Sequence, residues 1–227
     1  MSDSFIIDIN GLEKTYGSGS SAVRVLRGVD LKIAKGEIVA ITGPSGTGKS
    51  TLLNLIGCLD RFDKGSLLIN GEDVSAFNID ELSAFRNKNI GFIFQLHNLL
   101  PEFNALENIM MPLLIRRETK KMARSKAMEL LKAFNLEDRA LHKPGEMSGG
   151  ECQRIAVARA IAGSPEIILA DEPTGSLDSR NAIALLDILL SLCREHNTTV
   201  VIVTHDMNVA AKTDRVISML DGIIINQ

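Results

Sequence analysis

The residues with the clearest potential for chemistry form a glycine-rich loop between two apolar segments. The loop matches the pattern GxxxxGK[ST], and a strand-like run at 37–42 before it and helical spacing at 51–58 after it disfavour a chance match. Glycines let the backbone approach closely, so that successive N–H groups surround a phosphate at the helix N-terminus. The lysine then bridges β- and γ-phosphates, while the next hydroxyl ligates Mg²⁺. We therefore predict a nucleotide phosphate site at Gly43, Pro44, Ser45, Gly46, Thr47, Gly48, Lys49 and Ser50.

A second chemical feature is a pair of acids at the end of an apolar run. Residues 167–170 are Ile-Ile-Leu-Ala, and Asp171 and Glu172 follow directly. At the carboxyl edge of a parallel sheet such a pair faces the ligand crevice. Asp171 would hold Mg²⁺, and Glu172 would act as general base towards the attacking water. The alternative is a strand that ends in solvent with two acids, and the phosphate loop elsewhere in the chain disfavours it.

A third feature, Met147-Ser148-Gly149-Gly150-Glu151, precedes a predicted helix and offers free N–H groups to a second anion. One nucleotide already has a complete cradle in the first loop. The second site therefore makes sense if it covers the γ-phosphate bound by another copy of the chain. Taken alone, the segment is equally typical of a serine N-cap followed by glycines.

The elements that must position these residues alternate between short apolar strands and helices. Strands are expected at 5–9, 29–33, 37–42, 90–94, 167–170 and 199–203, and helices at 51–58, 81–86, 120–134, 151–162 and 180–195, with Pro101 and Pro112 in a loop. This order predicts an α/β fold with a mostly parallel sheet. We expect one domain, 1–227, with an N-terminal antiparallel β subdomain. Residues of about 1–95 and 160–227 form its core, and about 96–159 form an inserted helical subdomain.

Bulk composition excludes several classes of protein. A net charge of −3 disfavours a general nucleic-acid binder. No apolar run reaches the ~18 residues of a membrane-spanning helix, and the start of the chain lacks a secretory signal, so we expect a membrane role only through partners. The three cysteines show no CxxC spacing, and the histidines show no metal-ligand spacing.

Taken together, these motifs closely resemble the nucleotide-binding subunits of ATP-binding-cassette (ABC) transporters over essentially the whole chain. The family's markers occur in its order: Tyr16 as the adenine-stacking aromatic, Gly43 to Thr51 as Walker A, Gln95 as the Q-loop glutamine, Ser148, Gly149, Gly150 and Glu151 as the signature, Asp171 and Glu172 as the end of Walker B, Asp178 in the D-loop, and His205 as the switch histidine. Each short motif alone is weak, but seven in register are very specific.

The resemblance implies ATP and Mg²⁺ as ligands and a homodimer that closes on ATP. It implies catalytic roles for Glu172, His205 and Gln95, and Mg²⁺ contacts for Ser50, Gln95 and Asp171. Tyr16, the loop from Gly43 to Thr51, the signature residues and Asp178 would contact nucleotide. Met147 stands where leucine is usual, and Cys152 where glutamine is common; we interpret Cys152 as a small buried side chain rather than a redox-sensitive one.

The segment after Gln95 distinguishes branches of the family, because it docks the membrane permease in relatives. Residues 95–108 (QLHNLLPEFNALEN) and MPLL at 111–114 are similar to ATPases that power lipoprotein release at the cytoplasmic face of the bacterial inner membrane. We expect permease contact through about 95–115, although apolar residues there are equally consistent with core packing. Macrolide-exporter ATPases and a cell-division scaffold ATPase are the alternatives. A repair-type cassette ATPase would need a long coiled-coil insertion, and no sustained heptads occur.

Overall fold

A computed structural model describes residues 5–175 and 177–226, which divide into two compact units. Unit 1 comprises Met1–Ala84 and Thr199–Gln227, and unit 2 comprises Phe85–Thr198. Each unit has its own buried apolar side chains and carries part of the predicted chemistry.

The first part of unit 1 is an antiparallel sheet of the order β2-β1-β4-β5. Its strands are β1 (Phe5–Tyr16), β2 (Val23–Ala34), β4 (Lys64–Ile69) and β5 (Glu72–Asp73), and the short helix η1 (Gly19–Ser21) lies between β1 and β2. The alternate residues Ile7 and Ile9 are fully buried, as the period of a half-buried strand requires. Irregularities in the register then shift the pattern before Tyr16, which pairs with Val23.

The second part of unit 1 is built around β3 (Ile38–Thr42), which pairs in parallel with β8 (Thr199–Val203) and β9 (Arg215–Leu220). The final strand β10 (Ile223–Asn226) runs antiparallel to β9. β3 and β8 are buried at every position, which explains their continuous apolar sequences. The helices here are α1 (Lys49–Ile56), which starts after the glycine loop, η2 (Val74–Ala76) and α7 (Met207–Ala210).

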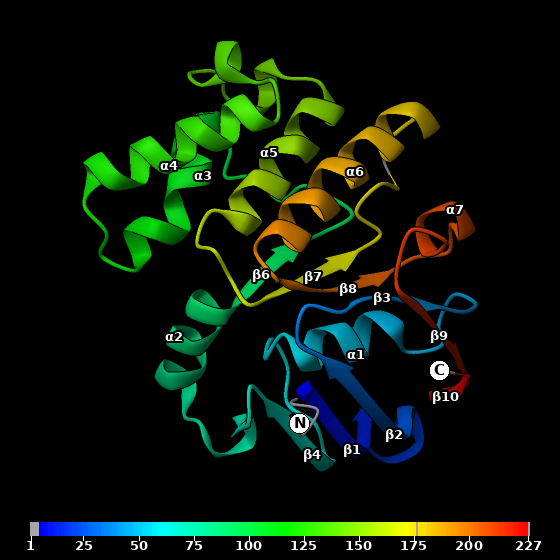
Figure 1. Cartoon of the computed structure of the whole chain (residues 1–227). Helices are drawn as coiled ribbons and strands as arrows, with labels where there is room; N and C mark the ends of the chain where they lie inside the picture. Colours follow the sequence, from blue (N-terminus) through cyan, green and yellow to red (C-terminus); the bar gives the residue numbers. More distant parts are fainter. Residues whose placement is uncertain (1–4, 176, 227) are drawn as a thin grey trace. The chain divides into compact units, whose positions relative to one another are not determined.

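Unit 2 combines a parallel strand pair with a group of helices. β6 (Ile90–Ile93) pairs with β7 (Ile167–Asp171), and α5 (Gly149–Ile161) packs against β6. A Cβ at Gly91 would collide with the carbonyl oxygen of Ala160, so glycine lets this strand and helix approach closely. Figure 1 shows α3 (Ala105–Ile115), α4 (Lys120–Ala133) and α5 together. The other helices are α6 (Ser179–Glu195), η3 (Glu137–Arg139) and η4 (Pro144–Glu146), and α2 (Ile79–Asn89) spans the boundary between the units.

The predicted fold class is confirmed: an α/β protein with an N-terminal antiparallel sheet, parallel strand pairs and a helical insertion. One local expectation is wrong, because Pro112 lies inside α3 rather than in a loop. A complete capping box of Asn104 and Glu107 starts this helix, and its buried face, which includes Ile109 and Leu113, holds it in place. The boundaries of the helical subdomain, about 96–159, remain a prediction.

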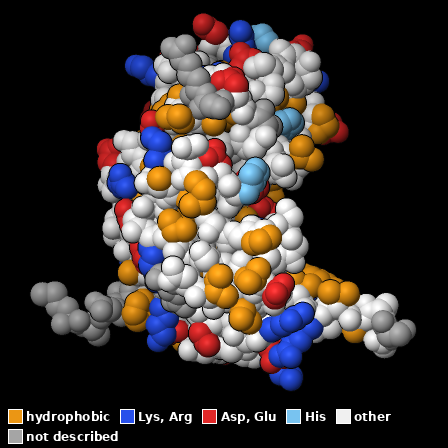
Figure 2. All heavy atoms as spheres, turned by 90° about the vertical axis from the view of Figure 1, so that its right-hand side faces the viewer, with side chains coloured by type: hydrophobic (Ala, Val, Ile, Leu, Met, Phe, Trp, Pro, Cys, Tyr) orange, Lys and Arg blue, Asp and Glu red, His pale blue; other side chains and the backbone are white. Residues whose placement is uncertain are grey.

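Among the described residues, none of the helices is both long and apolar enough to cross a membrane. On the face shown in Figure 2, hydrophobic side chains form separate small groups among polar and charged ones. The three cysteines, Cys58, Cys152 and Cys193, are all buried and unbridged.

Candidate functional site

The phosphate loop connects β3 to α1, as predicted, and its lysine is held across it. Lys49 is buried, and its Nζ donates to the carbonyl oxygens of Gly43 and Pro44, at 2.8 Å each. Thr47 Oγ1 donates to the Pro44 oxygen at 2.9 Å. Ser45 and Ser50, by contrast, are exposed. The loop therefore presents a buried ammonium and accessible backbone at a helix N-terminus, which is the arrangement that binds phosphate.

Two of the loop glycines are required by geometry. Gly43 has φ = 143°, and a Cβ there would collide with the carbonyl oxygen of Met219. Gly48, the N-cap of α1, has φ = 96°, and its Cβ would lie 2.8 Å from Leu26 Cδ2. Both positions combine a left-handed backbone with close neighbours, so any other residue would be strained.

Tyr16 lies at the end of β1 and reaches the helix that follows the loop. Its hydroxyl donates to Asp60 Oδ2 at 2.7 Å and also interacts with the Thr51 hydroxyl on α1. The residue is 41% exposed, so much of the phenol ring is accessible. Unit 1 therefore places the predicted base-stacking aromatic beside the predicted phosphate loop.

His205 follows β8 at the same edge of the parallel strands. Ile41 of β3 pairs with Val203 of β8, and Thr204 N donates to the Ile41 oxygen, so both strands end side by side. Asp206, the N-cap of α7, fixes the turn that carries the histidine by accepting from Asn208 N at 2.8 Å. The exposed His205 therefore projects from the edge of unit 1 that leads into the phosphate loop.

In unit 2 the ends of β6 and β7 bring Gln95 close to the predicted acids. Ile93 pairs with Ala170, so the residues after them lie at one sheet edge. Gly175 N donates to the Glu172 oxygen and closes a turn after the two acids. Gln95 Nε2 lies against this turn, 3.5 Å from the position that a Cβ on Gly175 would take. Asp171 and Glu172 are both half-buried.

Glu172 has φ = 47°, a left-handed conformation that is rare for glutamate. Holding a non-glycine residue there costs about 1–2 kcal/mol, and such strain concentrates at functional sites. The turn thus holds the backbone of the predicted general base in one conformation.

The sequence reasoning missed Gln153, which joins the two loops of this edge. Gln153 lies on α5 with no exposed surface, and its Nε2 donates to the carbonyl oxygens of Phe94 at 3.1 Å and Pro173 at 2.8 Å. One side chain therefore ties the signature helix to the residue before Gln95 and to the residue after Glu172. Its only sequence signal is its place on the predicted helix after the signature.

The signature serine is the N-cap of α5, so the motif has a structural role at the start of this helix. Ser148 N and Oγ donate to Glu151 Oε2 at 2.8 and 2.9 Å, and Glu151 N donates back to Ser148 Oγ at 3.3 Å. Arg139 Nε donates to Glu151 Oε1 at 2.8 Å. The bond from the Ser148 backbone, together with those from Arg139 and the Ser148 hydroxyl, lowers the pKa of Glu151 to about 2. Glu151 is therefore an ionised cap that orients the serine.

The cap does not close the motif to a ligand. Ser148 and Gly149 remain exposed, and a cavity of about 280 Å³ adjoins the motif. This cavity is lined by Ser148, Gly150, Arg154, Leu177, Asp178 and Asn181, together with residues of α6. The structure thus brings Asp178 next to the signature.

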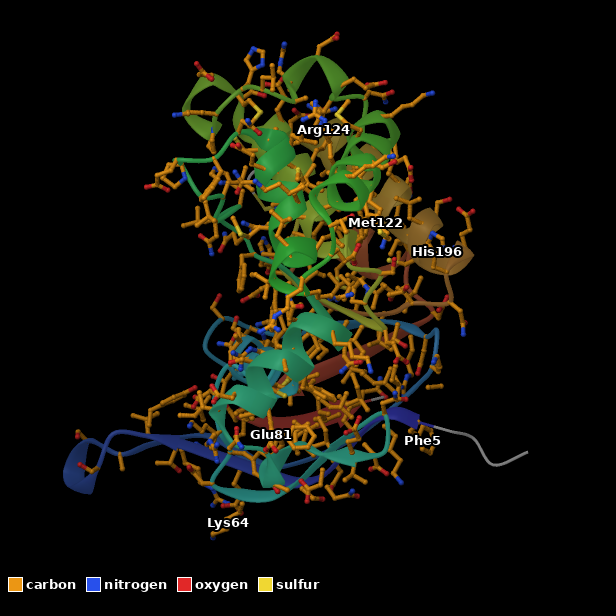
Figure 3. All side chains as sticks on the ribbon, turned by 90° about the vertical axis from the view of Figure 1, so that its left-hand side faces the viewer. Phe5, Lys64, Glu81, Met122, Arg124 and His196 are labelled. Atoms are coloured by element: carbon orange, nitrogen blue, oxygen red, sulfur yellow. The ribbon has the colours of Figure 1, made fainter. Side chains whose placement is uncertain are left out.

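The described residues hold no cluster of three or more His, Cys, Asp or Glu side chains that could bind a metal by themselves. His196 follows the end of α6 on the exposed surface that Figure 3 shows. Cys152 is buried, and burial together with Glu151 raises the pKa of its thiol, which agrees with our interpretation of a packing residue.

Comparison with known proteins agrees with this geometry. A family model described as "ABC transporter" matches residues 26–175, which include the phosphate loop, the signature and both acids. The chain belongs to the ABC transporter family. Its Walker A loop, signature and Walker B acids are the segments described above.

Curated relatives align with almost the whole of this ABC protein. The lipoprotein-releasing system ATP-binding protein LolD of Porphyromonas gingivalis is 52% identical, with 98% of this chain and 100% of the relative covered. The LolD proteins of Bacteroides thetaiotaomicron and Pseudoalteromonas translucida are 53% and 48% identical, over 96% of this chain and 99% and 94% of theirs.

Solved structures give the same fold. The ATP-binding cassette MJ0796, in a dimeric post-hydrolysis state bound to ADP and Pi, superimposes with a TM-score of 0.91 at 43% identity, with 97% of both chains covered. A second dimeric structure of this cassette gives a TM-score of 0.91 at 44% identity. The present ABC protein is accordingly an ATP-binding and ATP-hydrolysing cassette.

Proposed function

We propose that this ABC ATPase powers the release of lipoproteins from the inner membrane, acting at its cytoplasmic face through permease subunits. The observation that carries the proposal is the near-complete alignment, at about half identity, with LolD proteins of several bacteria. We assign ATP binding and hydrolysis to Tyr16, the glycine loop, Gln95 and the Walker B acids.

In this proposal Lys49 binds the β- and γ-phosphates, and the N–H groups of the glycine loop hold the rest of the triphosphate. Glu172 accepts a proton from the attacking water, and Gln95, beside the Glu172 turn, orients that water. His205 contacts the γ-phosphate. These residues supply positioning and charge, which account for most of phosphoryl-transfer catalysis.

The donor set also fits Mg²⁺. Ser50 offers an exposed hydroxyl, while Asp171 and Gln95 offer a carboxylate and an amide oxygen at one edge of unit 2. Mg²⁺ beside a nucleotide needs one or two carboxylates, with phosphates and waters as its other ligands. When bound, it neutralises charge that develops on the phosphate oxygens.

We propose further that Ser148, Gly149 and Gly150 complete the nucleotide site of a second copy. The exposed Ser148 and Gly149 and the half-buried Gly150 present N–H groups to a partner at the start of α5, and Asp178 lies beside them. Two copies would then close on two ATP molecules. The dimeric cassette structures to which the chain is similar support this arrangement.

For the permease we propose a groove in unit 2, within and beside the expected 95–115 region. The groove has a volume of about 350 Å³, and the stacked rings of Phe92 and Phe94, 5.4 Å apart, lie in it with Met111, Pro112 and the exposed Ile115. Leu99 is buried, so part of the 95–115 segment packs in the core rather than facing a partner.

The charges of the groove favour an acidic partner segment. Arg159 donates to the carbonyl oxygens of His97 and Asn98, and Arg116 donates to carbonyl and amide oxygens that include those of Asn87. Burial lowers the pKa of both guanidiniums. The groove's lining residues, all in the described part of the chain, include no Asp or Glu. An apolar helix with one or two acids would complement this surface.

A surface variant tests the groove. Ile115→Asp places an acid on an exposed groove residue and should abolish co-purification with the permease in detergent. The matched control is Leu141→Asp, since Leu141 is exposed in unit 2 outside the groove lining and should retain the permease. Equal loss of the permease in both variants, or in neither, contradicts docking at the groove.

The identity of the co-purified permease tests the transport proposal. Recovery of a permease with a large periplasmic domain that binds lipoprotein supports lipoprotein release. Recovery of a macrolide-exporter or cell-division permease instead would replace it with one of the two alternatives.

A further inference from the structure

The side chains behind Tyr16 form a polar network that the nucleotide-binding motifs do not include. Lys14 Nζ donates to Asp60 Oδ1 at 2.9 Å and to the carbonyl oxygen of Arg61 at 2.6 Å. Asp60 Oδ1 also accepts from Arg61 N at 2.7 Å, and Asp60 Oδ2 accepts from the Tyr16 hydroxyl. Both oxygens of Asp60 are therefore engaged, and one of them fixes the phenol.

Lys14 acts on the ring as well as on the acid. Its Nζ lies over the Tyr16 ring, 4.9 Å from the centroid, within the range of a cation–π contact. Lys14 is only 8% exposed, which is unusual for lysine, whereas Tyr16 is 41% exposed. The Lys14 ammonium thus covers one face of the Tyr16 ring, while part of Tyr16 remains exposed to solvent.

The loop that carries Asp60 is itself bonded to the end of β1. Thr15 N donates to Asp63 Oδ2 at 2.6 Å, and Asp63 N donates to the Glu13 oxygen at 2.9 Å. These bonds lie on either side of the contact between Asp60 and Lys14. Asp60 therefore stands on a loop that follows α1 and is fixed against the strand that carries Tyr16.

We propose that Asp60 and Lys14 are positioning residues for the base of bound ATP, because they hold the Tyr16 ring in the orientation that stacks on the purine. The inference rests on the proposed role of Tyr16 as the base-stacking residue. Neither Asp60 nor Lys14 needs to touch the nucleotide. They act by removing the rotational freedom of an exposed ring before ATP arrives, so that this cost is not incurred on binding.

The ionisation of the two groups agrees with this geometry. Burial and the bond to Asp60 raise the pKa of the Tyr16 phenol. Burial alone would raise the pKa of Asp60, but the bonds from Lys14, Tyr16 and Arg61 outweigh it and lower that pKa. Asp60 is thus ionised and Tyr16 is protonated at neutral pH, as the hydrogen bond between them requires.

The chain offers a selective probe, because Tyr16 is its one tyrosine and it contains no tryptophan. Labelling with ring-¹³C tyrosine gives a single set of NMR signals, from Tyr16. Asp60→Ala should lower the pH at which these signals titrate and should reduce their change on addition of ATP. The titration checks the bond between Asp60 and Tyr16, and the response to ATP checks whether that bond positions the ring for the nucleotide.

Steady-state kinetics of the full chain supply the second readout. Asp60→Ala should raise KM for ATP by about 3- to 10-fold and change kcat less than about 2-fold, a loss of the size expected for one ordinary hydrogen bond. Inorganic tripolyphosphate, which has no base, should inhibit the variant and the parent chain equally well. Tyr16→Ala should raise KM by about 5- to 100-fold, the loss expected for one stacked base.

A double variant and a control test whether Asp60 acts through Tyr16. In the Tyr16→Ala background, Asp60→Ala should raise KM no further. Asp8→Asn is the control, since Asp8 pairs at 3.3 Å with Lys32, which lies 5.2 Å from the Phe5 ring centroid on the same strands. Figure 3 labels Phe5 at the start of β1, away from the turn between β1 and β2, so this control should leave KM unchanged.

The outcomes distinguish the positioning role of Asp60 from the stacking role of Tyr16. If Tyr16→Ala raises KM while Asp60→Ala leaves both KM and the tyrosine signals unchanged, the positioning role is wrong and stacking by Tyr16 stands. An additive effect of Asp60→Ala in the Tyr16→Ala background also overturns positioning. If Tyr16→Ala itself leaves KM unchanged, the stacking role of Tyr16 is wrong and positioning falls with it.

Discussion

At the scale of single residues, the structure shows Glu151 as part of a helix cap, whereas the sequence predicts that it contacts nucleotide. Its carboxylate accepts from Ser148 and Arg139, so it stabilises the start of α5 and orients the signature serine. Ser148 Oγ donates to this carboxylate at 2.9 Å. To donate to a γ-phosphate, the serine hydroxyl must therefore rotate away from Glu151.

The depressed pKa of Glu151, about 2, predicts how the stability of the chain depends on pH. A carboxylate whose pKa is lower in the folded state stabilises the fold above its unfolded pKa, roughly 4.3, and this contribution is lost as pH falls towards 2. The free energy of unfolding of the parent should therefore exceed that of Glu151→Gln at pH 6, and the difference should shrink at pH 3.5. Urea unfolding at the two pH values measures it.

Glu137→Gln is the control for this measurement, because Glu137 is an exposed residue of η3 in the same unit. Its effect should be small at both pH values. A difference between the parent and Glu151→Gln that is the same at pH 6 and pH 3.5 would contradict the capping role.

A contact between residues can be predicted from the sequence only when the two residues lie close together in the chain. The phosphate loop is eight consecutive residues, and its pattern alone predicts its position between β3 and α1. The bond from Tyr16 to Asp60 joins residues 44 apart. Only the packing of β1 against the loop after α1 brings them together, so no local pattern could predict it. The left-handed φ of Glu172 is likewise set by its turn and has no sequence signal.

At the scale of elements, α3 shows why the helical insertion was only partly predicted. Proline disfavours a helix interior, because it lacks an N–H and crowds the preceding turn. In α3 the buried residues Leu106, Ile109 and Leu113 offset that cost, and Asn87 Nδ2 donates to the Pro112 oxygen at 3.2 Å. Packing thus overrides local propensity here.

The link made by Gln153 gives a prediction at the same scale. Gln153→Leu keeps the volume of the side chain but leaves the buried carbonyl oxygens of Phe94 and Pro173 without this donor. An unsatisfied buried group costs about 1–3 kcal/mol. We expect kcat for ATP to fall about 10-fold or more with a smaller change in KM, because the loops that carry Gln95 and Glu172 lose their common anchor.

Gln153→Glu separates this anchoring from simple packing. The glutamate has the same shape but cannot donate two hydrogen bonds, so it should impair kcat as Gln153→Leu does. Normal kcat in both variants, measured on chains that remain folded by circular dichroism, would show that the two bonds are not needed to position the loops of Gln95 and Glu172.

At the scale of the whole molecule, alternation of short apolar strands with helices was enough to predict an α/β fold, because buried parallel strands are continuous apolar runs. The order of the elements along the chain also predicts that the phosphate loop lies between a strand and a helix and that the two acids follow a strand. The division into the units Met1–Ala84 with Thr199–Gln227 and Phe85–Thr198 was not predicted, because it depends on contacts between residues distant in sequence.

The division assigns the phosphate loop to unit 1 and the signature to unit 2. Ser148 and Gly149 of the signature are exposed at the start of α5, so they are available to a second copy of the chain. We therefore expect ATP to join two such copies.

Light scattering of Glu172→Gln with and without ATP measures this association. The variant retains the phosphate loop but lacks the proposed general base, so it should bind ATP without turnover and shift from monomer to dimer. Lys49→Ala in the same background should bind ATP weakly and stay monomeric, while Gly150→Glu should bind ATP and stay monomeric. If the Glu172→Gln chain binds ATP yet remains a monomer, or dimerises equally well when it also carries Gly150→Glu, ATP does not join two copies through the signature.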